Sequence, residues 1–373
     1  MSISLRVFAA CLALFGLTAA LNGCSRNEPV RLGFVAGLTG RVADLGVAGR
    51  NGAMLAVEQR NAAGGINGRP VELLVRDDEQ NPGTARRAVT ELIGSNVDVI
   101  VGPMTSGMAM ATLPLINASK TIMVSPTVTT TELSGKDDNF LRVISSTSDY
   151  AAKSARCQFE RCGRRTVAVI HDQGNRSYTE SWLNDFSATF EGLGGRMVKR
   201  VSFISGNDNA FPRAARELVA VKPDVVLIIA NVIDAALICQ QVRRLDGNMP
   251  IAMAEWASTE RFTELAGAAS EGIHVSQFVN RNDPSERYRS FVKAYKERFG
   301  QEPGFAGVTA YDAAQVSLEA LARRQPGKSL KETILAMRTF QGVQQPITLD
   351  RFGDADRATF IAVIRSGNYL TLE

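Results

Sequence analysis

Two hydroxyl-rich segments contain residue types that suit recognition of an anion. Met104-Thr105-Ser106 and Thr127-Val128-Thr129 each follow a short apolar run of the kind that forms a buried strand, and the first leads into a helical pattern. Backbone amides at strand ends and at a helix N-terminus are fixed donors, and the helix dipole favours negative charge. We therefore expect these segments to bind a carboxylate. The alternative is that the hydroxyls serve only in turns and helix caps.

A carboxylate at the end of another strand would supply the opposite charge. Glu255 comes directly after the apolar run 251–254. In a buried position it would attract an ammonium group, and a ligand without that group would bind much worse, because a buried charge needs a partner. The alternative is a glutamate exposed at a strand end.

The chain contains few of the residues and motifs that are typical of enzymes. It has only two histidines, no Gly-x-Ser-x-Gly elbow and no P-loop, and no Gly-x-Gly-x-x-Gly follows its first predicted strand. We therefore expect binding rather than catalysis and no cofactor. A serine or glutamate can still react, so an enzyme stays open as an alternative that turnover of a bound ligand would establish.

The N-terminus has the layout of an export signal. Arg6 supplies a positive charge, and the apolar run 7–20 that follows is too short for a stable membrane span. Leu21-Asn22-Gly23-Cys24 then resembles a bacterial lipobox. We expect residues 1–23 to be a lipoprotein signal peptide, Cys24 to carry lipid and 24–29 to form a lipidated linker, so that the protein is held at the periplasmic face of a membrane. An ordinary signal with an incidental cysteine is the alternative.

Three cysteines remain beyond the predicted lipid site. An oxidising compartment permits a disulfide between Cys157 and Cys162, and two thiols are an equal alternative. Their spacing matches no common zinc pattern, so no metal site is expected. The net charge of +4 is spread along the chain without a long basic run, which argues against nucleic acid as a partner.

Short apolar runs alternate with helical patterns over most of the chain. A helix is expected after Asn81-Pro82, another near Asp208, and a third capped by Asp234. Repeated strand–helix units predict parallel sheets, and there are too many strands for one sheet, so we expect an α/β protein with two doubly wound sheets. The expected strands are 31–35, 71–76, 98–102, 121–124, 166–170, 197–202, 225–229, 251–254 and 273–276.

The chain is expected to pass between the two sheets near Ile144–Asp149 and near Ser276–Asn280. Residues 360–365 and 368–372 alternate around Ser366-Gly367, a pattern that predicts a C-terminal β-hairpin. Parallel α/β sheets bind ligands at the carboxyl ends of their strands, so two facing lobes would enclose a site between them.

An ordered set of segments resembles one family across essentially the whole chain beyond the signal. The set is Val30–Gly40, Ala62-Ala63-Gly64-Gly65-Ile66-Asn67-Gly68-Arg69, Val75-Arg76-Asp77-Asp78, Asp98-Val99-Ile100-Val101-Gly102-Pro103, Ser125-Pro126-Thr127 and Ala310-Tyr311-Asp312-Ala313. It is similar to the branched-chain amino-acid-binding proteins, which are type I periplasmic solute-binding proteins of ABC importers.

The resemblance implies two Rossmann-like lobes joined by three hinge crossovers, the third near Val343–Thr348. Lobe 1 would comprise 30–147 with 277–345, and lobe 2 would comprise 148–276 with 346–373. The implied function is capture of a small carboxylate ligand, most simply an apolar or aromatic amino acid, and delivery to an ABC permease. A ligand-sensing receptor subunit, or a binder of amides or of aromatic or organic acids, would have the same fold.

The resemblance also assigns roles to individual residues. Residues at the positions of Ser106, Thr127 and Thr129 hold the α-carboxylate in the family, and an acidic residue at the place of Glu255 holds the α-amino group. Tyr178 falls where a ligand-contacting tyrosine is found. The remaining positions form the side-chain pocket, where this chain departs from the common pattern, and they are Leu45, Met104, Asn231, Trp256 and Phe305.

Overall fold

The computed structural model describes residues 28–372. The predicted signal peptide 1–23, the lipidation site Cys24 and most of the linker 24–29 lie outside the described residues. Among the helices of residues 28–372, none has the length and apolar character needed to cross a membrane.

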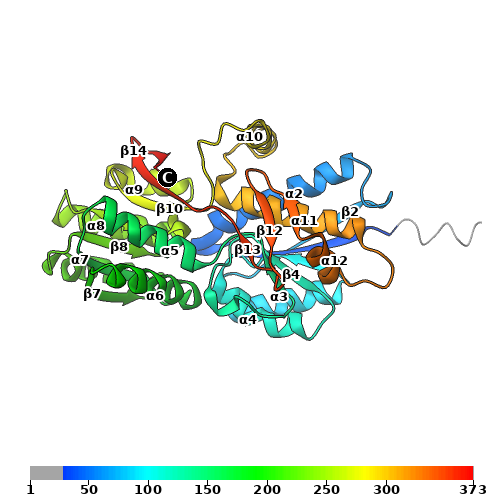
Figure 1. The fold of residues 1–373 in the computed structure, drawn as a ribbon, viewed down its shortest axis with the longest axis horizontal. Coiled ribbons are helices and arrows are strands. Elements are labelled where there is room, and N and C mark those ends of the chain that lie inside the picture. Colours follow the sequence, from blue (N-terminus) through cyan, green and yellow to red (C-terminus); the bar gives the residue numbers. More distant parts are fainter. Residues whose placement is uncertain (1–27, 373) are drawn as a thin grey trace, which may run out of the picture.

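The first of two large sheets has five parallel strands in the order β2-β1-β3-β4-β5. With its helices it forms the first lobe, at the right of Figure 1. Its strand order reverses between β1 and β3, which defines a topological switch point at the carboxyl ends of these strands. The strands are β1 (Val30–Ala36), β2 (Val71–Asp77), β3 (Val99–Val101), β4 (Ile122–Ser125) and β5 (Phe140–Arg142).

The second sheet has seven strands in the order β15-β14-β10-β9-β8-β6-β7 and forms the second lobe, at the left of Figure 1. The five strands from β6 to β10 are parallel, and the C-terminal hairpin adds two antiparallel strands beside β10. The strands are β6 (Thr166–Asp172), β7 (Arg196–Phe203), β8 (Val225–Ile229), β9 (Ile251–Met253), β10 (His274–Gln277), β14 (Phe360–Arg365) and β15 (Asn368–Thr371).

Helices cover the faces of both sheets. In the first lobe α2 and α11 pack together on one face and α3 and α4 on the other, while α5 with α6 and α7 with α8 and α9 enclose the second sheet. Because both faces are covered, the strands can be apolar throughout. The helices are α2 (Ala43–Ala62), α3 (Pro82–Gly94), α4 (Ser106–Asn117), α5 (Thr147–Arg156), α6 (Arg176–Gly192), α7 (Phe211–Ala220), α8 (Val232–Leu245), α9 (Arg261–Ala266), α10 (Glu286–Phe299), α11 (Gly304–Arg323) and α12 (Leu330–Met337).

All nine strands expected from the sequence are present, and the hairpin turn forms at Ser366-Gly367 with positive φ at both residues. The short β5 and a separate three-stranded antiparallel sheet were not expected from the sequence. That sheet comprises β11 (Thr339–Gln341), β12 (Pro346–Leu349) and β13 (Ala355–Asp356).

Two of the three expected helix starts are confirmed. Asn81 caps α3 by accepting from the amides of Gly83 and Thr84, and α7 follows a short turn that begins at Asp208. The cap predicted at Asp234 is wrong, because Asn231 caps α8 and accepts from the amides of Ile233 and Asp234. Asn231, two residues after the end of β8, fulfils the same role three residues earlier.

The chain leaves the first sheet after β5 and enters the second sheet at β6. After β10 it forms α10 and α11, which pack on α2 of the first lobe. It rejoins the second sheet at Phe360, after β12 and β13. The division into lobes at residues 147, 277 and 345 stays a prediction in detail.

Candidate functional site

The two hydroxyl-rich segments lie side by side at the carboxyl ends of β3 and β4. Thr105 is the residue before α4 and Ser106 is its first residue. The Thr127 hydroxyl donates to the carbonyl of Met104 over 2.6 Å, and the Ser106 hydroxyl accepts from the amide of Thr130 over 3.4 Å. These bonds hold the two segments together at the N-terminus of α4, where amide donors and the helix dipole suit an anion.

The structure brings eight of the twelve predicted ligand-binding residues around one small cavity between the lobes. These eight are Leu45, Met104, Thr105, Ser106, Thr127, Tyr178, Trp256 and Phe305. Two further lining residues, Asn175 and Phe278, were not predicted. The cavity measures about 10 Å³, so the surrounding side chains fill most of the space in this conformation.

The other four predicted residues do not line the cavity. Val128 packs in the hydrophobic core of the first lobe, and the side chain of Asn231 is occupied by capping α8. Thr129 is fully buried, and its hydroxyl finds no hydrogen-bonding partner among residues 28–372. Such an orphaned hydroxyl is costly unless a ligand satisfies it. Glu255 accepts from the hydroxyl of Tyr178, which does line the cavity.

Glu255 is fully buried in the second lobe, and two hydrogen bonds fix the orientation of its carboxylate. Tyr178 donates its hydroxyl to Oε1 and Trp182 donates its indole N–H to Oε2, each over 2.9 Å. Neither donor is charged, and none of the basic side chains described pairs with this carboxylate. Burial raises the pKa of Glu255 to about 7, even though hydrogen bonds from its own backbone amide, Trp182 and Tyr178 lower it. The group is therefore a buried acid without a compensating positive charge.

Aromatic rings form the walls of the cavity. The rings of Tyr178 and Trp256 meet edge to face at 5.6 Å between centroids, and those of Phe278 and Phe305 lie at 4.7 Å. Together with Leu45 they make an apolar surface opposite the hydroxyls of the first lobe. Polar groups at one end of a cavity and aromatic rings along its other walls are typical of a site for a small amphipathic molecule.

The lobes also touch through polar contacts. Arg41 of the first lobe bonds Asp208 and Asp234 of the second, each at 2.6 Å. The amide of Gly107, in the first turn of α4, donates to Asn175 Oδ1 over 2.9 Å. These contacts can form only when the lobes are close, so the conformation is a closed one.

The Arg41 contacts are expected to stabilise closure. Replacing Arg41 by alanine leaves Asp234 buried without its cation, so the closed form loses about 1 kcal/mol and ligand affinity falls about fivefold. Calorimetry would measure affinity, and X-ray scattering would show a larger radius of gyration. Arg213→Ala is the matched control, because Arg213 pairs with Glu217 within α7. Equal radii and affinities in the two variants would contradict a closing role for Arg41.

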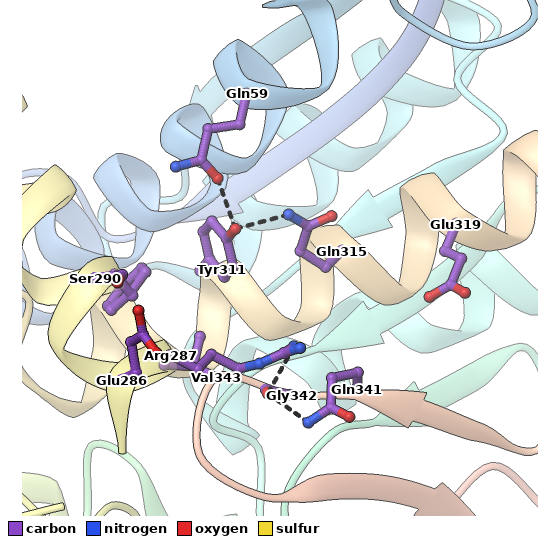
Figure 2. A pocket seen from close by; sticks show the side chains of 11 residues that line it. Gln59, Glu286, Arg287, Ser290, Tyr311, Gln315, Glu319, Gln341, Gly342 and Val343 are labelled. Carbon is purple, nitrogen blue, oxygen red and sulfur yellow. Dashed lines mark hydrogen bonds between the residues drawn. The ribbon is translucent and has the colours of Figure 1, made fainter. Parts of the chain in front are cut away.

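A second, larger cavity of about 800 Å³ lies within the first lobe and shares no lining residue with the first. Figure 2 shows it between α2, α10, α11 and the end of β11, with Tyr311 donating to Gln59 and accepting from Gln315. Arg287 and Gln341 both donate to the carbonyl of Gly342 there. The Gln59, Tyr311 and Gln315 side chains are therefore held by one another.

The site residues missed from the sequence are Asn175, Phe278 and Arg41. Asn175 directly precedes α6 and Phe278 directly follows β10, so both occupy strand-to-helix or crossover positions where site residues are expected. Arg41 lies in a short helical turn after β1, at Gly40–Val42, and no local pattern links it to aspartates in the other lobe.

The chain belongs to the periplasmic binding protein family. The family model with the description "Periplasmic binding protein" matches residues 29–368. Within that family it is a type I protein of the branched-chain amino-acid group. It is similar to the Leu/Ile/Val-binding protein BraC3 of Rhizobium johnstonii, with 28% identity over 335 residues that cover 89% of this chain and 90% of the relative.

Solved structures share the fold over nearly the whole chain. A leucine-binding protein, LivK, from Thermotoga maritima matches with a TM-score of 0.85 and 26% identity, covering 92% of this chain and 98% of that one. A solute-binding protein of an ABC transporter from R. palustris, in complex with benzoate, matches with a TM-score of 0.83, covering 92% and 96%. At 19% identity the second likeness shows the fold alone. The expected fold class is confirmed, and the protein is a solute-binding protein of ABC transporters rather than an enzyme.

Proposed function

We propose that the protein captures an apolar or aromatic amino acid between its two lobes and delivers it to an ABC permease while a lipid on Cys24 holds it at the periplasmic face of a membrane. The observation that carries the ligand proposal is Glu255, a buried carboxylate held by two neutral donors. An α-ammonium group is the simplest partner for that charge.

The other parts of an amino acid have matching groups around the cavity. The α-carboxylate suits the N-terminus of α4 with Ser106, Thr127 and the orphaned Thr129 hydroxyl. The side chain suits the aromatic wall that includes Trp256 and Phe305. The relatives point in the same direction, since BraC3 is called a Leu/Ile/Val-binding protein and LivK a leucine-binding protein.

Opening of the lobes is part of the proposal, because a cavity of about 10 Å³ admits about one water molecule and no amino acid. Separation would release the α4 amide of Gly107 from Asn175 and make this donor available to a carboxylate. Closure over the ligand would then exclude water and strengthen the polar contacts.

A thermal-shift screen of the mature domain from Ser25 tests the proposal. We expect leucine, isoleucine, valine or phenylalanine to raise the melting temperature, and their des-amino analogues not to do so. Stabilisation by des-amino carboxylates, benzoate included, would assign the protein to the aromatic or organic-acid binders instead. No response to any amino acid would contradict the proposal, and recovery of a membrane sensor kinase without a permease would favour a sensory subunit.

A further inference from the structure

Two cysteines and a histidine converge in the second lobe, well away from the lining of the interlobe cavity. Their ligand atoms, the two sulfurs and one imidazole nitrogen, all lie within 4.8 Å of one another. His274 Nδ1 is 3.5 Å from Cys162 Sγ and 4.0 Å from Cys157 Sγ. No disulfide joins the two cysteines.

A wide helical turn brings the cysteines together. Helix α5 ends at Arg156, and the next turn, Cys157–Arg161, is a π-helix closed by the bond from the Cys162 amide to the Cys157 carbonyl over 3.0 Å. In an α-helix, residues five apart point about 140° away from each other, whereas the i→i+5 bond of a π-turn places them one above the other. The unusual turn therefore has a local effect, which is to put both sulfurs on one side.

The third group comes from a distant part of the chain. His274 is the first residue of β10, which packs against α5 in the second lobe (Figure 1). Cys157 is buried, and Cys162 and His274 are half-buried. The sequence spacing of the two cysteines predicted no metal site, because the third ligand is contributed by tertiary structure.

The separations match those that a tetrahedral metal ion imposes. Zinc bonds to sulfur at about 2.3 Å and to nitrogen at about 2.0–2.1 Å, so the sulfur–nitrogen edge of its tetrahedron is about 3.6 Å. The observed sulfur–nitrogen separations are 3.5 and 4.0 Å. A Cys–Cys disulfide would account for the two sulfurs but would leave the position of the imidazole unexplained.

A cationic side chain lies beside the two cysteines. The guanidinium of Arg164 interacts electrostatically with both Cys157 and Cys162. Thiolate is the form that coordinates a metal, and two thiolates neutralise a divalent cation, so Arg164 need not repel it.

We propose that Cys157, Cys162 and His274 Nδ1 bind a thiophilic cation, Zn²⁺, with solvent as the fourth ligand. Binding displaces the protons of the two thiols into solvent and leaves the imidazole neutral. The ion links the end of α5 to the start of β10. The passages between the lobes adjoin the first residue of α5, Thr147, and the last residue of β10, Gln277. The ion binds at the other end of each element, and it therefore fixes the position of α5 relative to β10 at the end away from the hinge.

Cobalt binding to the full-length protein, purified in detergent under reducing, metal-free conditions, tests the site. We expect one equivalent of Co²⁺ to give the near-ultraviolet thiolate charge-transfer band and the intense visible bands of tetrahedral cobalt, and Zn²⁺ to displace it. One equivalent of each metal should bind to Cys239→Ala, the matched control, because Cys239 is buried in α8. Cys162→Ser and His274→Gln should lose the charge-transfer signal or weaken binding at least tenfold.

A stability measurement provides a second readout. Zn²⁺ at about a hundred times its Kd should raise the melting temperature of the wild type by about 5 °C and leave His274→Gln unchanged. Absence of Co²⁺ and Zn²⁺ binding to the reduced protein would overturn the proposal. So would isolation of the exported protein with Cys157 and Cys162 joined, shown by resistance to alkylation before reduction, since a disulfide removes both thiolates.

Discussion

Replacing Glu255 by glutamine raises the Kd for the amino-acid ligand by about ten- to a hundredfold, the expected loss for one charge-assisted contact of about 1.5–3 kcal/mol. Glutamine keeps the size of the side chain and can still accept from Tyr178 or Trp182, so the main change is the loss of negative charge. Isothermal titration with the amino acids that stabilise the wild type would measure the effect.

Two controls accompany this variant, a des-amino ligand and a substitution of a surface glutamate. A des-amino analogue has no ammonium group, so its weak binding should be unchanged or improved by Glu255→Gln. Glu302→Gln removes a glutamate that pairs with Lys296 at the surface, and it should bind the amino acid like the wild type. An affinity for the amino acid within about twofold of the wild type in Glu255→Gln would remove the basis for assigning an ammonium partner.

Affinity for the amino acid is expected to fall as pH is lowered below about 7. Burial raises the pKa of Glu255 to about 7 in the ligand-free protein, so below that value the carboxyl is mostly neutral. An ammonium ligand requires the ionised form, and binding must therefore release a proton. The observed Kd should rise about tenfold for each pH unit below 7 and level off above about pH 8.

Titration calorimetry in buffers of different ionisation enthalpy would count the released proton directly. Glu255→Gln should bind with a Kd that changes little over the same range, which separates this carboxyl from other buried acids such as Asp44 and Asp172. Proton uptake on binding, or an affinity for the wild type that is constant between about pH 5 and pH 8, would mean that Glu255 does not change its ionisation when ligand binds.

The sequence was sufficient for the architecture because most strands of the parallel sheets are short runs rich in apolar and β-branched residues between helical patterns. Four strands of the structure were not predicted from the sequence. The β5 strand is only three residues long, Phe140–Arg142, and the strands β11 to β13 have two to four residues each, too short for periodicity to be recognised.

For the candidate site, residues that follow a strand were predictable, and contacts between lobes were not. Thr105, Ser106 and Trp256 lie within five residues of the end of β3 or β9, where the fold places ligands, and they line the cavity. Val128 lies in an equally suitable position, but its side chain points into the core. Arg41 and Asp234 are brought together only by tertiary structure, and neither shows a sequence pattern that marks it as a partner.

The first and last strands among residues 28–372 belong to different lobes. Strand β1, at Val30, lies in the first sheet, and the hairpin β14–β15 lies at the edge of the second. A six-residue linker spans at most about 20 Å, so lipid on Cys24 would hold the first lobe close to the bilayer. In the frame of the membrane the second lobe would then be the part that swings, and it would carry Glu255 and the C-terminus with it. A fluorophore fused after residue 373 would therefore report each capture event as a change in distance from the lipid surface.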